Sequence, residues 1–138
     1  MKHLLLTLLA SGFCFSTFAA DGWKVYFGND KAQILYLYSD CHDVANGIHQ
    51  QKILLKFINL TNQKQEISFS EELIYSNSPK PVNTDAKSYT VKLQPKEVKE
   101  GDCSTKDYSY FIFSKQLNFK DTELKKFELT NISVIDIQ

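Results

Sequence analysis

Apolar and polar residues alternate with a period of two along much of the chain, which is the pattern of half-buried β-strands. The segment Ser88–Leu93 is the clearest example, because its apolar residues all fall on one face and its polar residues on the other. The same period predicts strands over Trp23–Phe27, Gln33–Ser39, Tyr108–Phe113 and Phe127–Ile137. We therefore expect seven or eight short strands and almost no helix.

The stretch Gln51–Ser70 contains two further strands joined by a polar segment, Asn59–Lys64. Each strand places its apolar residues on one face: Ile53, Leu55 and Phe57 on the first, Ile67 and Phe69 on the second. Two alternating segments separated by a short polar turn are typical of a β-hairpin. We predict that these two strands pair with each other.

Three other features refine the expected strands. Gln33–Ser39 and Tyr108–Phe113 are apolar on both faces, which favours central positions in a sheet. The apolar phase of the last strand slips near Asn131, and a β-bulge there would explain the slip. Asp121 could cap one short helical turn before that strand.

Many short strands separated by turn residues favour an all-β fold, and strands with one wet face favour a sandwich over a barrel. The segment Leu93–Val98 resembles the strand-to-turn segment of small exported bacterial immunoglobulin-like domains. The resemblance covers only these few residues and implies an antiparallel immunoglobulin-like β-sandwich, without implying an activity. We predict a seven- to eight-stranded fold of this class with one disulfide.

The first nineteen residues have the layout of a signal peptide: a basic start at Lys2, an apolar run, and small residues at Thr17 and Ala19. We predict cleavage after Ala19, which leaves residues 20–138 as a single domain that is exported to the periplasm or secreted. The alternative is an uncleaved membrane anchor, but the apolar run is short for a span. A lipid anchor at Cys14 is disfavoured because bulky Phe13 precedes it.

The charge pattern excludes some partners. The chain has sixteen basic and sixteen acidic residues, and every basic residue is a lysine. There is no basic patch for nucleic acid and no arginine for bidentate phosphate recognition. We expect no nucleic-acid partner and no membrane span in the mature chain.

After cleavage, Cys41 and Cys103 are the two remaining cysteines. An oxidising compartment favours their pairing, so we predict a disulfide between them. The rival interpretation, a reactive thiol, needs a reducing setting and a neighbouring base.

The densest polar cluster, Asp40–Asp43, offers His42 as a metal ligand, to which His49 or Asp102 could be added. Structural zinc needs four ligands, usually with thiolates, and the disulfide removes the thiols. We predict no metal and no cofactor. Neither Ser104 nor Ser109 lies in a nucleophile motif, so we also predict that the chain is not an enzyme.

These exclusions leave recognition as the expected function. We expect an exported, non-enzymatic binding module with a protein or glycan partner, acting through a strand edge or through loops such as Ser76–Asp85. Seven tyrosines could supply an exposed contact group or fill the core and its rim. The alternative is an inhibitor of a secreted protease or lysozyme with a projecting loop, for which Pro79, Lys80 and Pro81 are the candidate residues. A small hydrolase is the least favoured hypothesis.

Overall fold

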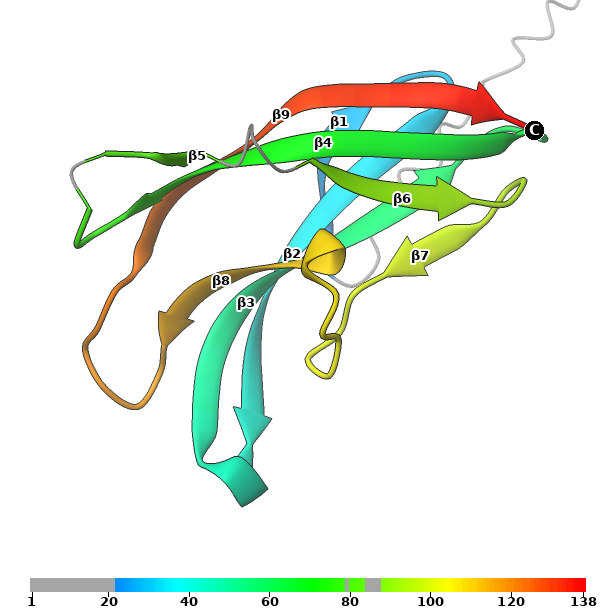
Figure 1. Cartoon of the computed structure of the whole chain (residues 1–138). Helices are drawn as coiled ribbons and strands as arrows, with labels where there is room; N and C mark the ends of the chain where they lie inside the picture. The colour runs from blue at the N-terminus through cyan, green and yellow to red at the C-terminus, as the bar shows by residue number, and fades with distance from the viewer. Residues whose placement is uncertain (1–21, 79, 84–87) are drawn as a thin grey trace, which may run out of the picture.

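The computed structural model describes residues 22–78, 80–83 and 88–138, and this part of the chain is all-β, as predicted (Figure 1). Its elements are β1 (Lys24–Gly28), β2 (Ala32–Asp43), η1 (Val44–Asn46), β3 (Ile48–Asn59), β4 (Lys64–Tyr75), β5 (Val82–Asn83), β6 (Tyr89–Leu93), β7 (Val98–Glu100), η2 (Tyr108–Tyr110), β8 (Phe111–Gln116) and β9 (Leu124–Ile137). The two η elements are 3-10 turns of three residues each. The predicted signal peptide, residues 1–19, lies outside the described residues.

The strands form two antiparallel sheets. In the first sheet, which we call sheet A, β1, β2 and β3 lie in that order, and β7 and β8 both pair with the far side of β3. In the second, sheet B, β4 is central, with β9 on one side and β6 and β5 on the other. Sheet A curls, so that β2 and β3 run out of the core toward the bottom of the view in Figure 1.

The two strands of Gln51–Ser70 do exist, but they do not pair with each other. β3 belongs to sheet A and β4 to sheet B, so the predicted hairpin is wrong. The reason is that their apolar faces pack against each other across the core: the rings of Phe57 and Phe69 stack with centroids 5.6 Å apart. The polar segment carries the chain between the sheets, and buried Asn59 fixes it by donating to the Gln63 carbonyl at 2.7 Å.

One hydrophobic core lies between the sheets. Its buried members come from both of them: Ala32, Ile34, Ile53, Leu55, Phe57 and Ile112 from sheet A, and Ile67, Phe69, Leu73, Val91, Leu93 and Leu129 from sheet B. Five of the seven tyrosines pack against this core as partly buried residues: Tyr26, Tyr36, Tyr75, Tyr89 and Tyr110. Most of the tyrosines therefore fill the core and its rim.

Several local predictions can be compared with the strands. The central position predicted for Gln33–Ser39 is confirmed, because β2 lies between β1 and β3. The central position of Tyr108–Phe113 is wrong. Its first half is η2, whose turn begins where the Asp107 carboxylate accepts the Ser109 N–H at 2.8 Å, and β8 pairs with β3 on one side.

Two strands, β9 and β1, contain irregularities in their pairing. Asn131 has a positive φ of 51°, and β9 carries an extra residue relative to β4 at that point, so the predicted bulge is confirmed. A register shift also lies between Val25 and Phe27 in β1, and it leaves Val25 59% exposed while Tyr26 packs inward. Trp23, Val25 and Phe27 would share one face of a regular strand, so the shift breaks the alternation that predicted a strand over Trp23–Phe27. No helix forms at Asp121, which lies in the connection between β8 and β9.

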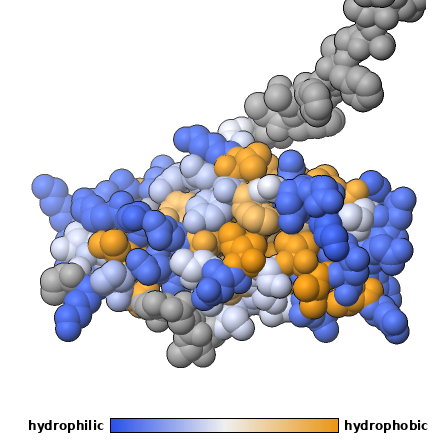
Figure 2. Space-filling model, turned by 90° about the horizontal axis from the view of Figure 1, so that it is seen from above, coloured by the Kyte–Doolittle hydropathy of each residue, from blue (hydrophilic) through white to orange (hydrophobic). Residues whose placement is uncertain are grey.

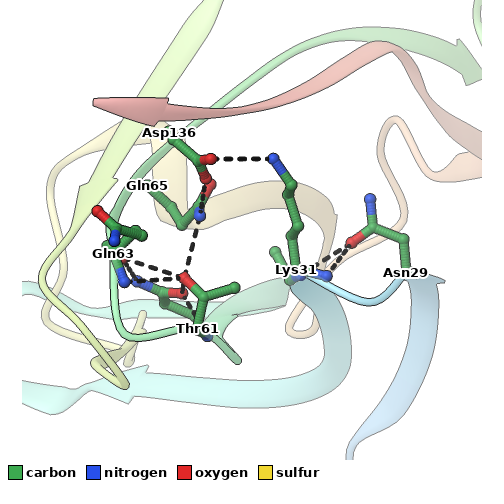
Figure 3. A network of polar contacts seen from close by, with 8 residues as sticks. Asn29, Lys31, Thr61, Gln63, Gln65 and Asp136 are labelled. Atoms are coloured by element: carbon green, nitrogen blue, oxygen red, sulfur yellow. Dashed lines mark hydrogen bonds and ion pairs between the residues drawn. The ribbon is translucent and has the colours of Figure 1, made fainter. Parts of the chain in front are cut away.

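A polar network closes one end of the molecule (Figure 3). Fully buried Gln65 on β4 donates to the Asp136 carboxylate on β9, and also to the Thr61 hydroxyl at 3.0 Å. Lys31, in the turn between β1 and β2, reaches the same carboxylate at 3.2 Å. The network joins three segments that are far apart in sequence, so its role is to hold the two sheets together at this end.

The surface seen from above in Figure 2 mixes apolar and hydrophilic side chains over the middle of the molecule, with mostly hydrophilic residues toward both ends. Such mixing is expected of antiparallel sheets that have one face in water. In the described part of the chain, no helix is long and apolar enough to cross a bilayer.

Candidate functional site

The β2–β3 hairpin projects from the rest of the molecule (Figure 1). Its strands pair without interruption from Ala32 opposite Asn59 to Asp43 opposite Ile48. The half nearer the turn extends away from sheet B, and we call residues 40–51 the hairpin tip. The tip is therefore the part of sheet A that does not cover the core.

The sequence of the turn explains why the hairpin closes tightly. The Asp43 carboxylate accepts the backbone N–H of Asn46 at 3.2 Å and its side-chain amide at 2.7 Å. Gly47 follows with a φ of 64°, a left-handed conformation that glycine adopts without steric cost. These contacts form η1 and reverse the chain within four residues.

The predicted disulfide is confirmed and fastens one face of the tip. Cys41 on β2 is bonded to Cys103, with the two Cα atoms 5.4 Å apart. Lys52, only 7% exposed, supports the same connection by donating from Nζ to the Cys103 carbonyl at 3.2 Å. The Lys52 ammonium also lies 4.3 Å from the centre of the Phe111 ring. The loop from Gly101 to Thr105 is thereby held against the hairpin.

The opposite face of the tip carries a row of polar pairs. Successive residues of a strand point to opposite faces, so His42 lies on the other face from Cys41. Asp40 and Gln51 face each other, and Gln51 both donates to Asp40 at 3.0 Å and accepts from the Ser114 hydroxyl at 3.1 Å. The hydroxyl of Ser114, on β8, links this pair to a third strand and anchors the base of the tip.

The next pair toward the turn is His42 opposite His49. The two rings lie with centroids 5.1 Å apart, and their Nδ1 atoms are 2.9 Å apart. Asp102, the other candidate ligand, is not part of this pair. Its carboxylate accepts the Ser104 and Thr105 hydroxyls at 2.6 and 3.1 Å instead. Among the described residues, no three histidine, cysteine or acidic side chains converge on one point that could hold a metal ion.

A cavity of about 350 Å³ lies between the hairpin tip and the disulfide-bonded loop. Its lining includes Cys41, Ile48, Lys52, Cys103, Ser104 and Lys106. A second hollow, of about 470 Å³, lies beside it against Val44, Ala45 and Cys103. Both sides of the loop therefore offer concave surface next to the tip.

Hydrogen bonds favour the ionised form of two carboxyl groups near the tip. The Asn46 amide lowers the pKa of the Asp43 carboxyl group by hydrogen bonding, and the Ser104 hydroxyl does the same for the pKa of Asp102. Both carboxylates are ionised at neutral pH. Lys52 and Lys106 bring two positive charges to the cavity wall, against the single carboxylate of Asp43. This arrangement suits the binding of an anionic group better than proton transfer.

The loop predicted to project, Pro79 to Pro81, is only partly described. Pro79 lies outside the described residues, whereas Lys80 and Pro81 are exposed and lead into β5. The Ser78 hydroxyl donates to the Lys80 carbonyl at 2.8 Å. These residues do not contribute to the cavity at the hairpin tip.

Two apolar residues at the tip were missed by the sequence reasoning. Val44 is 80% exposed and Ile48 is 40% exposed, on either side of the turn. The hydrophobic period predicts no strand between Ser39 and Gln51, because polar residues mask the alternation of two strands there. The signal that could have found it is the combination of Asp43, Asn46 and Gly47, which is typical of a tight turn between paired strands.

Comparison with known proteins gives no relative to argue from. No family model matches the chain, no curated protein matches it, and no solved structure matches it. The basis for inferring a function is therefore the site itself.

Proposed function

We propose that this chain is an exported, non-enzymatic binding module that engages a protein partner through the hairpin tip. The observation that carries the proposal is the projection of the β2–β3 hairpin away from sheet B while the Cys41–Cys103 disulfide fastens one face of its tip. An element that is already ordered loses little conformational entropy on binding. A projecting, fastened turn is therefore a suitable recognition element.

The chemistry of the tip indicates what the partner presents. Val44 and Ile48 are exposed apolar side chains that would be buried by an apolar pocket on the partner. Beside them, Lys52 and Lys106 line the cavity and favour a carboxylate. The expected partner surface is an apolar depression with an acidic residue at its edge.

The proposal also includes an exported location and an immunoglobulin-like fold class for the chain. A disulfide persists in oxidising compartments, which supports export to the periplasm or beyond the cell. The two antiparallel sheets around one core, with the segment Leu93–Val98 at a turn, support an immunoglobulin-like β-sandwich.

A second candidate function is inhibition of a secreted or envelope enzyme, such as a protease or lysozyme. The hairpin tip favours it, because an inhibitor needs a rigid element that enters an active-site cleft. The two functions differ in one outcome. An inhibitor lowers the activity of the enzyme that it captures at equal molar amounts, whereas a binding module leaves the partner's activity unchanged.

Site-specific photo-crosslinking in the native cell envelope tests the proposal. A benzoylphenylalanine at Val44 should crosslink to one defined protein, because this side chain points away from its own domain. The matched control is the same label at Lys92, which is exposed on β6 in the other sheet. Equal crosslinking at both positions, or a product at Lys92 alone, would contradict recognition by the tip.

A further inference from the structure

The two histidines at the hairpin tip lie close enough to bind one metal ion together. His42 and His49 are direct cross-strand neighbours, and their Nδ1 atoms face each other at 2.9 Å. A neutral imidazole has one nitrogen lone pair that can bind a metal ion. At this separation the two nitrogens share one hydrogen bond, and a metal ion would bind beside the line that joins them, once the rings turn both lone pairs toward it.

The separation of the two nitrogens is compatible with their binding one metal ion as neighbouring ligands. With metal–nitrogen bonds of about 2.05 Å, nitrogens 2.9 Å apart subtend an angle of ~90° at the ion. Tetrahedral coordination requires them to be about 3.3 Å apart. An angle of ~90° is that of neighbouring ligands in a square-planar site, the geometry preferred by Cu(II) and Ni(II) with nitrogen and oxygen ligands.

The surroundings hold the pair ready and leave room for other ligands. Asp40, Gln51 and Ser114 tie the strands together one residue pair below the histidines, and the disulfide fastens the opposite face. His42 is exposed and His49 is partly exposed, so water or a partner's side chain can complete the coordination. The protein thus supplies two nitrogen ligands on strands whose relative position is fixed.

From this geometry we propose that the Nδ1 atoms of His42 and His49 form a binding site for a square-planar divalent transition metal, of which Cu(II) is the type. The site takes the ion in neighbouring coordination positions; the ion replaces the hydrogen bond between the rings, and the ring that carried a proton on Nδ1 carries it on Nε2 instead. This proposal does not depend on the identity of the protein partner. It changes the sequence-based expectation of no metal, which assumed that a site would need four ligands.

Titration of the disulfide-bonded protein with Cu(II), followed by electron paramagnetic resonance, tests the proposal. The protein carries no polyhistidine tag, and its only other histidine is His3. We expect one Cu(II) per chain with hyperfine coupling from two imidazole nitrogens. His42→Asn and His49→Gln should each weaken binding on the order of 100-fold, because each removes the chelate effect of the second ring.

A variant in which one histidine is moved tests whether binding depends on the placement of the two rings or only on the number of histidines. His49→Gln combined with Gln50→His keeps two imidazoles but moves one to the opposite face of β3. It should bind Cu(II) as weakly as His49→Gln, while circular dichroism reports an unchanged fold. Binding as tight as that of the native protein would overturn the proposal, as would native binding no tighter than that of His42→Asn.

A measurement on the unaltered protein completes the test. In nuclear magnetic resonance, Cu(II) added below one equivalent should broaden the ring signals of His42 and His49 before any others, since a paramagnetic ion relaxes the nuclei closest to it. Broadening that begins at carboxylates or at the amino terminus would place the ion elsewhere and contradict the site.

Discussion

Tyr26 on β1 and Leu129 on β9 are joined by two hydrogen bonds through a single hydroxyl group. The Tyr26 Oη accepts the Leu129 N–H at 2.8 Å and donates to the Leu129 carbonyl at 3.3 Å. The two residues belong to different sheets, so this contact links sheet A to sheet B. The Tyr26 ring also packs against Phe127, with centroids 5.8 Å apart. One side chain thus connects the edge strand of the curled sheet to the backbone of the facing sheet.

Tyr26→Phe should therefore destabilise the fold by about 1–2 kcal/mol, because it removes both hydrogen bonds and leaves a partly buried backbone N–H unsatisfied. The matched control is Tyr38→Phe, at a residue 49% exposed to solvent, which should change the free energy of unfolding by less than about 0.5 kcal/mol. Urea denaturation measures both. Equal effects of the two substitutions would show that the Tyr26 hydroxyl does not tie the sheets.

The disulfide should stabilise the domain substantially. Cys41 and Cys103 are separated by 62 positions, for which the chain-entropy model gives about 4 kcal/mol as an upper figure. Cys41→Ser combined with Cys103→Ser should lower the midpoint of thermal unfolding markedly and speed amide hydrogen exchange in the hairpin tip. An unchanged midpoint would mean that the bridge contributes little. Slower or equal exchange at the tip would mean that the bridge does not hold it.

Any side chain at Gly101 should destabilise the fold. A Cβ at this position would meet the Tyr110 carbonyl oxygen and lie 2.9 Å from the Tyr110 Cβ, while the Gly101 N–H is fixed by the Leu55 carbonyl at 3.0 Å. Gly101→Ala should cost about 2 kcal/mol or more, because the backbone of the loop must move.

Gly47→Ala is the matched comparison for Gly101→Ala. Gly47 has a positive φ but open space around it, so alanine there should cost only about 1 kcal/mol of left-handed strain. Thermal unfolding of the two variants gives the comparison. The interpretation fails if Gly101→Ala is the milder of the two.

Acid should weaken the polar network at the closed end. Hydrogen bonds from Gln65 and Lys31 lower the pKa of Asp136 in the folded protein below its value in the unfolded chain. The stabilisation is therefore complete above the unfolded pKa, near 3.9, and is lost as the pH falls through the lower folded pKa. Asp136→Asn should make the free energy of unfolding less dependent on pH between about 4 and 2. Adding Lys31→Met to Asp136→Asn should cause no further change in the pH dependence of the free energy of unfolding. If the native protein and Asp136→Asn show the same pH dependence, Asp136 is not the group responsible.

The strands could be predicted from the sequence because burial of one face imposes a period of two. Ser88–Leu93 illustrates this, since β6 covers Tyr89–Leu93 with Val91 and Leu93 buried. Pairing could not be predicted in the same way. The alternation in β3 and β4 is the same whether the strands lie side by side or face to face, and only the stacking of Phe57 on Phe69 distinguishes the two arrangements.

The site was less predictable than the fold. The pairing of Cys41 with Cys103 followed from the count of cysteines, but the hairpin tip did not follow from any hydrophobic pattern. Most of its strand residues are polar, with Cys41 and Ile48 as the exceptions, so they carry no regular hydrophobic period. The meeting of His42 and His49 depends on the register of β2 and β3, which is fixed both by the turn between them and by the burial of their apolar faces in the core.

Recognition through the hairpin tip is tested most directly by the affinity of the partner crosslinked at Val44, measured with two single variants. Val44→Asp should weaken binding by about ten-fold or more, because it places a charge where an apolar contact is expected, and it should leave the thermal midpoint unchanged since Val44 is 80% exposed. Lys92→Glu, on the other sheet, should leave the affinity within about two-fold of the native value. If the two variants bind equally well, or if Lys92→Glu alone weakens binding, the hairpin tip is not the recognition surface.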